Sequence, residues 1–227
     1  MVKITNKKIK SADNSSLPYL QFEPENNSNN KSIILVYEIF GLTNHIKNVA
    51  KVYAKNGFLV VIPEIFYRLE NNIDLAYDKV GFSKGLHLKE KLGWDLPIMD
   101  IVALAATLRL ETNVNILGFC YGGSLAWLAM QKSFIFDKGI CYYGSSIPEF
   151  LELNLNCPAM LHFGKKDKSI PSVSIEKVKK YTEKNKYKVK LFEYENADHG
   201  FNCNERKSYN KVASKMAFEK TLKFLKD

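Results

Sequence analysis

The chain has 227 residues and a formal net charge of +9, since 33 Lys and Arg residues outnumber 24 Asp and Glu residues. Its composition, 46% hydrophobic and 25% charged, excludes a disordered chain and is typical of a globular protein with a substantial core. Lysines alternate with acidic residues in segments such as 174–190, so the charge is not gathered into the basic patch that nucleic-acid binding requires.

The N-terminus lacks the apolar core of a signal sequence, and no segment approaches the roughly 18 apolar residues of a membrane span. The four cysteines, Cys120, Cys141, Cys157 and Cys203, are widely separated and include no CxxC pair. Their spacing predicts neither a zinc site nor a disulfide framework. We expect a cytoplasmic protein with reduced thiols, no membrane association and one domain at residues 1–227, because no Pro-, Gly- or Ser-rich linker divides the chain.

The first thirty residues predict an edge hairpin. Residues 4–9 and 17–22 are strand candidates separated by the turn-forming sequence SADNSS, and the polar residues 24–31 are expected to form a loop.

From residue 31 onward, short apolar runs alternate with amphipathic stretches, which is typical of parallel strands buried on both faces by crossover helices. The predicted strands span residues 32–37, 58–63, 113–118, 138–143, 159–164 and 189–194, and the predicted helices span residues 44–56, 95–110, 121–131, 172–184 and 208–225. We therefore expect an α/β fold with a mostly parallel central sheet and helices on both faces. Residues 64–93 are expected to be irregular or partly helical, and they could cap a pocket.

Glycines flank a cysteine where an apolar run ends and a helical pattern begins. Residues 118–123 read GFCYGG, which has the G-x-C-x-G form of a nucleophile elbow. In such an elbow the nucleophile adopts a strained backbone between strand and helix, and small flanking residues avoid collisions. The turn directs backbone N–H groups, beginning with that of Tyr121, toward a carbonyl oxygen at the sulfur. Cys120 is therefore a candidate nucleophile; the alternative is a small buried residue beside glycines that permit close packing.

Two candidate partners follow the last two predicted strands. Asp167 comes just after the fifth parallel strand and His199 just after the sixth. Because the carboxyl ends of parallel strands meet at one edge of a sheet, both side chains are expected near Cys120. There His199 would accept the thiol proton, and Asp167 would orient and stabilise the imidazole. Asp167 could instead cap the following helix, and Asp198 is a less favourable alternative acid.

Glu38 lies directly after the predicted strand at residues 32–37, in the sequence YEIFGL. If it faces the cleft, its carboxylate could hydrogen-bond the resting thiol or receive its proton, and the N–H of Ile39 would be a second donor to an oxyanion. A glutamate at this position could instead face solvent or cap the helix that follows.

Five sequence blocks, in this order along the chain, resemble the dienelactone hydrolase family of α/β-hydrolases. They are YEIFGL (37–42), GFLVVIPEIFYR (57–68), GFCYGG (118–123), GKKDKSIP (164–171) and ADHGF (197–201). Together with the final helix, the resemblance covers almost the whole chain and implies a single α/β-hydrolase domain.

The resemblance also implies a mechanism, which is hydrolysis of a lactone or activated carboxylic ester through a thioester acyl-enzyme, with no metal or organic cofactor. The roles that it implies are a triad of Cys120, Asp167 and His199, a resting thiol held by Glu38, and backbone oxyanion donors at Ile39 and Tyr121.

The substrate-binding residues depart from the family pattern. Members that open dienelactone are expected to bind its carboxylate with cationic side chains, but the residue four positions after His199 is Cys203. Arg206 and Arg68 are the candidates for this role, although each could equally lie on the surface. This departure argues against dienelactone itself as the substrate.

Two other classes of function stay open. Cys120 could be a peroxide-reactive or redox-active thiol, with Cys203 approaching it as a resolving partner, or the chain could be a non-catalytic binding protein on a hydrolase fold. A nucleotide-binding role is not indicated, because no G-x-G-x-x-G follows a strand and no Walker motif is present. We expect a small-molecule ester or lactone as the partner, no nucleic acid, and a monomer or weak homodimer.

Overall fold

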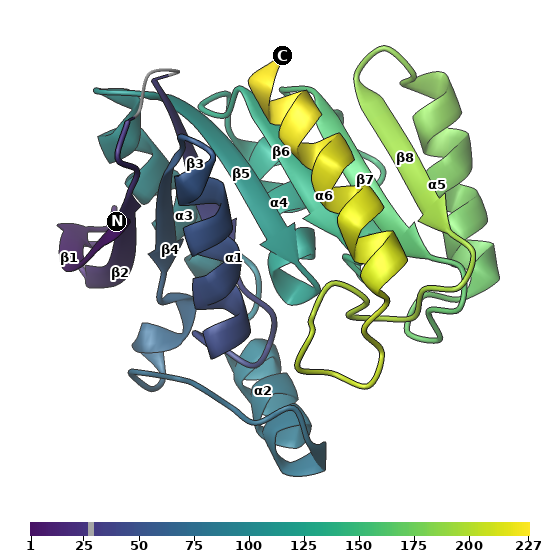
Figure 1. The fold of residues 1–227 in the computed structure, drawn as a ribbon, viewed down its shortest axis with the longest axis horizontal. Coiled ribbons are helices and arrows are strands. Elements are labelled where there is room, and N and C mark those ends of the chain that lie inside the picture. Colours follow the sequence, from purple (N-terminus) through teal and green to yellow (C-terminus); the bar gives the residue numbers. More distant parts are fainter. Residues whose placement is uncertain (27–29) are drawn as a thin grey trace.

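The computed structural model describes residues 1–26 and 30–227 and is built around one eight-stranded sheet (Figure 1). Along the sheet the strands follow the order β1-β2-β4-β3-β5-β6-β7-β8. Their bounds are β1 (Lys3–Lys10), β2 (Ser16–Glu23), β3 (Lys31–Val36), β4 (Leu59–Pro63), β5 (Asn113–Phe119), β6 (Lys138–Tyr142), β7 (Ala159–Gly164) and β8 (Val189–Tyr194). All neighbours from β4 to β8 pair in parallel, so the predicted α/β fold is confirmed.

The N-terminal hairpin extends the sheet at one edge, as predicted. β1 pairs with β2 in an antiparallel register from Lys3 opposite Glu23 to Lys10 opposite Ser16, and β2 pairs antiparallel with β4. In the expected loop at residues 24–31, residues 27–29 lie outside the part of the chain that the structure describes.

The helices cover both faces of the sheet. α1 (Asn44–Lys55) and α6 (Lys211–Lys226) lie side by side on one face, where the rings of Tyr53 and Phe218 are 5.4 Å apart (Figure 1). The other face carries α3 (Asp95–Arg109), α4 (Tyr121–Lys132) and α5 (Ser172–Lys184), with a ring contact of 5.5 Å between Trp127 of α4 and Tyr181 of α5. Strand β7 is buried along its whole length because it is covered on both sides.

Residues 64–93 contain more regular structure than their sequence predicts. They form a short 3-10 helix, η1 (Ile65–Arg68), and the helix α2 (Lys79–Leu92), which begins at the N-cap residue Asp78. Gly81 and Gly85 weaken the helical pattern of this segment, but both are needed for close packing. A Cβ atom on Gly85 would lie only 2.4 Å from the carbonyl oxygen of Ile39.

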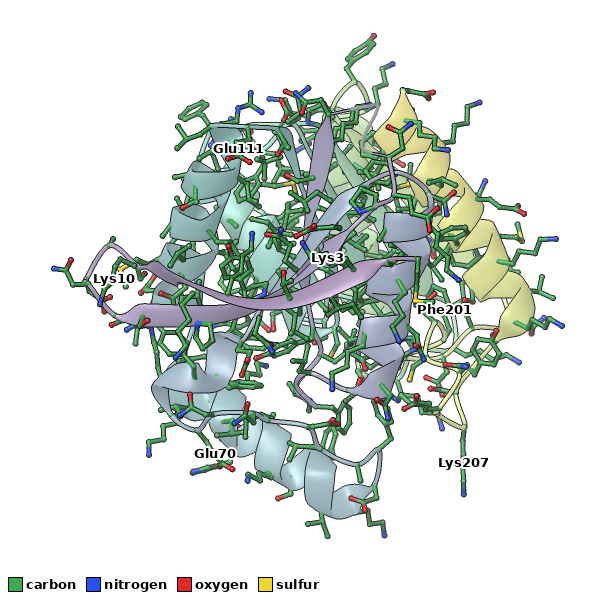
Figure 2. The ribbon with its side chains drawn as sticks, turned by 60° about the vertical axis from the view of Figure 1, so that its left-hand side comes forward. Lys3, Lys10, Glu70, Glu111, Phe201 and Lys207 are labelled. Carbon is green, nitrogen blue, oxygen red and sulfur yellow. The ribbon has the colours of Figure 1, made fainter. Side chains whose placement is uncertain are left out.

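α2 and the loop after β8 lie beyond the carboxyl end of the sheet, where the strand arrows point (Figure 1). The positive charges are scattered, with Lys10 and Lys207 on opposite sides of the molecule (Figure 2). Several lysines are paired with acidic residues, as in Lys84 with Glu70 at 2.7 Å. None of the helices in residues 1–26 and 30–227 has the length and apolar character needed to span a bilayer.

Candidate active site

Cys120 occupies a sharp turn between β5 and α4. Its backbone has φ 54° and ψ −117°, a conformation that residues other than glycine rarely adopt. Close approach of the surrounding backbone explains the two flanking glycines. A Cβ atom on Gly118 would lie 1.9 Å from the carbonyl oxygen of Gly122, and one on Gly122 would lie 2.2 Å from that of Val36. The turn therefore has the geometry of a nucleophile elbow.

The ring of His199 lies between the sulfur of Cys120 and the carboxylate of Asp167. His199 Nε2 is 3.1 Å from Cys120 Sγ, and Nδ1 is 2.8 Å from Asp167 Oδ2. The other carboxylate oxygen of Asp167 accepts a hydrogen bond from the N–H of Ser169 at 2.8 Å, which fixes the orientation of the carboxylate. Asp198 is bonded to the backbone N–H of His199 rather than to its ring. The structure thus brings together the three residues whose proximity the sequence predicts.

The charge environment of His199 favours a protonated ring. Burial by itself lowers the pKa of His199, but a negative charge on Cys120 and the hydrogen bond to Asp167 outweigh burial and raise it to about 10. The arrangement can therefore hold a reactive sulfur next to a proton donor.

Glu38 is buried at the same edge of the sheet, with 1% of its surface exposed. Its Oε1 accepts a hydrogen bond from Arg206 Nη1 at 3.2 Å, and its Oε2 has no hydrogen-bond partner among the described residues. The guanidinium also lies over the rings of Phe40 and Tyr77, at 5.5 and 5.9 Å. The expected hydrogen bond between Glu38 and the thiol of Cys120 is not formed in this structure, because Glu38 is paired with a full positive charge and the sulfur faces His199.

The two candidate arginines have different surroundings. Arg206 lies beside Glu38 and close to the cysteine, whereas Arg68 is bound elsewhere. Its guanidinium donates to Asp100 at 2.7 and 2.8 Å and to Asp13 at 2.7 Å, which ties η1 to α3 and to the turn of the N-terminal hairpin. Because two carboxylates already occupy Arg68, we leave it out of the proposed substrate site.

Two backbone N–H groups lie just after strands β3 and β5, in the segments that carry Glu38 and Cys120. Within the described residues, the N–H groups of Ile39 and Tyr121 donate to no backbone or side-chain acceptor. Tyr121 is the first residue of α4, where the helix dipole adds to the attraction for negative charge. The carbonyl group of Ile39 packs closely against Gly85 of α2. This pair of donors has the composition of an oxyanion hole.

The sequence model of the dienelactone hydrolase family matches residues 18–227, which is most of the chain. The chain belongs to the dienelactone hydrolase family. A protein of Synechocystis named "Putative carboxymethylenebutenolidase" is 29% identical over 203 residues, which cover 83% of this chain and 82% of that protein. A carboxymethylenebutenolidase of Pseudomonas putida is 24% identical over 200 residues, with 85% and 84% covered.

The fold agrees with this assignment to the dienelactone hydrolase family. A crystal structure titled "Putative Dienelactone Hydrolase", from Klebsiella pneumoniae, superposes with a TM-score of 0.85 at 23% identity and covers 99% of this chain and 98% of that chain. The predictions of an α/β-hydrolase fold and of a carboxylic-ester hydrolase are therefore confirmed.

Two aromatic residues of the site, Tyr143 and Tyr77, are not identified by the sequence analysis. Tyr143 is fully buried with φ 37°, its ring is 5.1 Å from that of His199, and its hydroxyl has no partner among the described residues. Its position directly after β6 could have identified it, because Cys120 lies directly after β5 in the same way. Tyr77 packs on Phe40 at 4.7 Å and belongs to the segment whose structure was not predicted.

The remaining thiols, His45 and His162 are packed into the fold, whereas His87 is exposed on α2. Cys141, Cys157 and Cys203 are all buried. For Cys203, burial and the nearby Glu38 raise the pKa to about 11. His162, fully buried, contacts Tyr194 and Thr221. No three or more His, Cys, Asp or Glu side chains gather into a candidate metal site within residues 1–26 and 30–227.

Proposed function

We propose that the protein hydrolyses small activated carboxylic esters or lactones, with Cys120 as nucleophile, His199 as acid and base, and Asp167 as the residue that orients His199. The observation that carries this proposal is the position of one imidazole 3.1 Å from the sulfur and 2.8 Å from the carboxylate. The names of its relatives, carboxymethylenebutenolidases, support a lactone or enol ester as the substrate.

In the acylation step, the Cys120 sulfur attacks the acyl carbon and forms a C–S bond. Negative charge develops on the carbonyl oxygen, where the N–H groups of Ile39 and Tyr121 stabilise it. When the tetrahedral intermediate collapses, the C–O bond of the ester breaks and the leaving oxygen takes the proton of the His199 imidazolium. For a lactone, the leaving hydroxyl stays attached to the acyl group.

In the deacylation step, neutral His199 removes a proton from water as the water oxygen attacks the thioester carbon. The C–S bond then breaks, the acid is released, and the sulfur leaves as a thiolate beside the newly formed imidazolium. Asp167 stabilises this imidazolium in both steps without taking up its proton.

Glu38 and Arg206 bear on the kind of substrate. Because Glu38 neutralises Arg206 in this structure, the pair favours an uncharged ester or lactone over dienelactone, whose carboxylate would need a cation. We propose that Glu38 positions Arg206 and that Arg206, rather than Arg68, borders the bound substrate.

The proposal is tested with 4-nitrophenyl acetate and intact-mass measurement. The wild type should turn over the ester and carry one acetyl group on Cys120 during the reaction, whereas Cys120→Ala should lose both the turnover and the adduct. Cys157→Ala, which removes a buried thiol away from the site, is the matched control and should keep its activity. Unchanged turnover by a folded Cys120→Ala protein would contradict covalent catalysis.

The redox alternative is less well supported. A resolving thiol must be accessible and ionised, but Cys203 is completely buried and burial raises its pKa. A loss of two hydrogen atoms from the mass after peroxide treatment, mapped to Cys120 and Cys203, would favour redox chemistry. The proposal otherwise keeps the expectations of a single-domain cytoplasmic enzyme that works without a cofactor, as a monomer or weak homodimer.

A further inference from the structure

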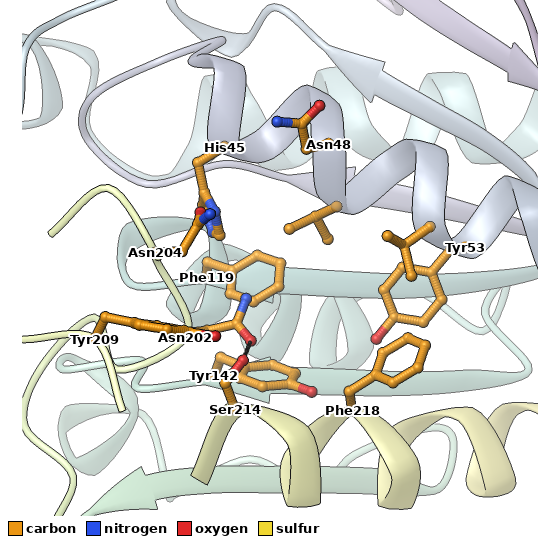
Figure 3. Close-up of a pocket in the computed structure, with 12 residues that line it drawn as sticks. His45, Asn48, Tyr53, Phe119, Tyr142, Asn202, Asn204, Tyr209, Ser214 and Phe218 are labelled. Carbon is orange, nitrogen blue, oxygen red and sulfur yellow. Dashed lines mark hydrogen bonds between the residues drawn. The ribbon is translucent and has the colours of Figure 1, made fainter. Parts of the chain in front are cut away.

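The two residues next to Cys120 in the chain have different surroundings. Phe119, on one side, lines a cavity of about 260 Å³ between α1 and α6 (Figure 3). Tyr121, on the other side, is 2% exposed and packs among aromatic rings. Its ring lies 5.3 Å from that of Trp94 and 6.1 Å from that of Phe66, on which it stacks at an angle of 13°. The elbow is therefore held by close side-chain packing on the side of Tyr121.

The hydroxyl of Tyr121 makes a contact at the end of α2. It donates a hydrogen bond to the carbonyl of Gly93 at 2.5 Å. Burial raises the pKa of Tyr121, so the hydroxyl keeps its proton and can donate. Gly93 ends α2 with φ 71°, and its own N–H donates to the carbonyl of Lys89 at 3.0 Å. The bond from Tyr121 therefore joins the end of α2 to the first residue after the candidate nucleophile.

α2 has few other polar links to the rest of the protein. Apart from its N-cap, only one further side-chain hydrogen bond or ion pair joins it to another part of residues 1–26 and 30–227, between Lys84 and Glu70 at 2.7 Å. Both of these side chains are exposed, and such pairs contribute little stability. The buried apolar side chains of α2, Leu88 and Leu92, lie in the half next to Gly93. The position of the helix therefore depends strongly on the contacts at this end.

The same helix packs on the segment that carries Ile39. A Cβ atom on Gly85 would lie 2.4 Å from the carbonyl oxygen of Ile39, so the helix and this peptide are in direct contact. Gly85 and Gly93 are eight residues apart, which is about 12 Å along a helix. α2 therefore contacts both segments whose N–H groups we assign to the oxyanion hole, that of Ile39 near its middle and that of Tyr121 at its end.

We propose that the side chain of Tyr121 is a positioning residue for ester hydrolysis, because its hydroxyl fixes α2 against Ile39 through Gly93. Oxyanion stabilisation requires donors about 2.7–3.1 Å from the developing charge, so a small displacement of a donor peptide weakens it. Without the hydroxyl, the end of α2 moves more freely, and the Ile39 peptide that packs on the helix moves with it. The catalytic part of this inference rests on the proposed function, whereas the anchoring of α2 does not.

The positioning role is tested by Tyr121→Phe, which removes only the hydroxyl and keeps the ring. With 4-nitrophenyl acetate its kcat should fall about three- to tenfold, as expected for the loss of one hydrogen bond, while KM stays within about twofold. Tyr181→Phe is the matched control, because the Tyr181 hydroxyl also donates to a carbonyl, that of Leu153 at 3.3 Å, but lies on α5. The control should keep the wild-type kinetics. An unchanged kcat in Tyr121→Phe would overturn the positioning role.

The rate at which iodoacetamide alkylates Cys120 separates this role from an effect on the thiol. Alkylation forms a C–S bond by displacing iodide and develops no oxyanion, so Tyr121→Phe should be alkylated at the wild-type rate. A parallel fall in alkylation and kcat would overturn an action through the oxyanion donors. If instead the wild type hydrolyses the ester without acetylation of Cys120, the proposed function fails, and the two failures are therefore distinguishable.

The anchoring of α2 is tested without any substrate by amide hydrogen exchange. In Tyr121→Phe the amides of residues 79–92 should exchange about threefold faster than in the wild type, or more, because the helix opens more often. In Tyr181→Phe these amides should exchange at the wild-type rate. Equal exchange of α2 in Tyr121→Phe and the wild type would overturn the anchoring, whatever the kinetics show.

Discussion

Two histidine centres lie near each other at the carboxyl half of the sheet, and their comparison shows how partners decide the role of a side chain. His162 contacts the hydroxyls of Tyr194 and Thr221 at 2.9 and 3.0 Å, and His199 contacts a carboxylate and a sulfur at 2.8 and 3.1 Å. The consecutive residues Tyr142 and Tyr143 each place a ring against one of them, at 4.4 and 5.1 Å. The geometry is similar, but the charges are not.

This difference in charge separates a structural histidine, His162, from His199, the histidine that we propose to be catalytic. Burial among neutral groups lowers the pKa of His162 to about 3, so its ring stays neutral. For His199, burial has the same effect, but a negative Cys120 and the carboxylate of Asp167 reverse it and raise the pKa to about 10. A protein can therefore use two imidazoles for different purposes by surrounding them with hydroxyl or ionised partners.

The largest expected effect comes from exchanging each histidine for glutamine. His199→Gln should reduce kcat/KM for 4-nitrophenyl acetate about 10⁴-fold or more, because the proton donor and acceptor is lost. His162→Gln should leave the kinetics within about threefold but lower the free energy of unfolding by about 1–3 kcal/mol, because a buried network is broken. Steady-state kinetics and urea unfolding on the same samples check both. A strong loss of activity in a stable His162→Gln protein would remove the distinction.

The second-largest effect is expected from Asp167, whose carboxylate helps to raise the pKa of His199. Asp167→Asn keeps the shape but removes the charge, so it should lower the pKa of His199 and reduce kcat about 10²–10⁴-fold. NMR titration of the His199 ring gives the pKa directly. Asp198→Asn is the control, since that carboxylate is bonded to the backbone, and it should leave the titration unchanged. Equal shifts in the two variants would contradict the assignment of Asp167.

A smaller effect is expected from the helix that packs against the proposed oxyanion donor. Gly85→Ala would place a Cβ atom 2.4 Å from the carbonyl of Ile39, so it should displace that peptide and lower kcat about tenfold with little change in KM. Gly81→Ala, on the same helix, meets the carbonyl of Ala76 at 2.0 Å and is the matched control for general strain in α2. If both variants lose activity equally, α2 does not act through Ile39.

The last effect is the pH dependence of stability, to which the two histidines contribute with opposite sign. The folded-state pKa of His199 lies above its ordinary value of 6.5, so its stabilisation is complete below pH 6.5 and is lost as the pH rises toward 10. The folded-state pKa of His162 lies below 6.5, so its contribution is complete above pH 6.5 and is lost as the pH falls toward 3.

Each group can change the free energy of unfolding by at most about 1.4 kcal/mol per pH unit. Urea midpoints should therefore decline as the pH falls below 6.5 (the acid side) and as it rises above 6.5 (the alkaline side). His162→Gln should flatten only the acid side, and Asp167→Asn should flatten only the alkaline side. If the urea midpoints of His162→Gln and the wild type decline identically at acid pH, groups other than His162 cause that decline.

Much of the fold, and the proximity of Cys120, Asp167 and His199, could be predicted because short stretches of sequence carry the necessary patterns. Short apolar runs mark the buried strands, and the rule that ligands bind at their carboxyl ends places Asp167, His199 and Cys120 at one edge. Tyr143 follows β6 in the same way, but a tyrosine after a tyrosine in an apolar run looks like strand core. The sequence allows residues 64–93 to be partly helical but does not give the bounds of α2, because its two glycines serve packing and lower its intrinsic helix propensity.

The pairing of Glu38 with Arg206 could not be predicted by the same reasoning. These residues are 168 positions apart, and their contact depends on how the loop after β8 folds back over the segment after β3. A local pattern identifies Glu38 as a residue at the mouth of a strand, but it does not say whether a thiol or a guanidinium will be its partner. Likewise, nothing near Arg68 indicates that Asp13 and Asp100 will bind it.

The positive φ of Cys120 has a consequence for how such a protein can adapt to heat. A side chain in this conformation costs on the order of 1–3 kcal/mol, and glycine would relieve most of that cost. We expect Cys120→Gly to be inactive yet to melt at a higher temperature than the wild type; a lower melting temperature would show that the contacts of the thiol outweigh the strain. Selection for thermal tolerance at this position thus opposes selection for turnover, and a heat-resistant descendant must gain its stability at other positions.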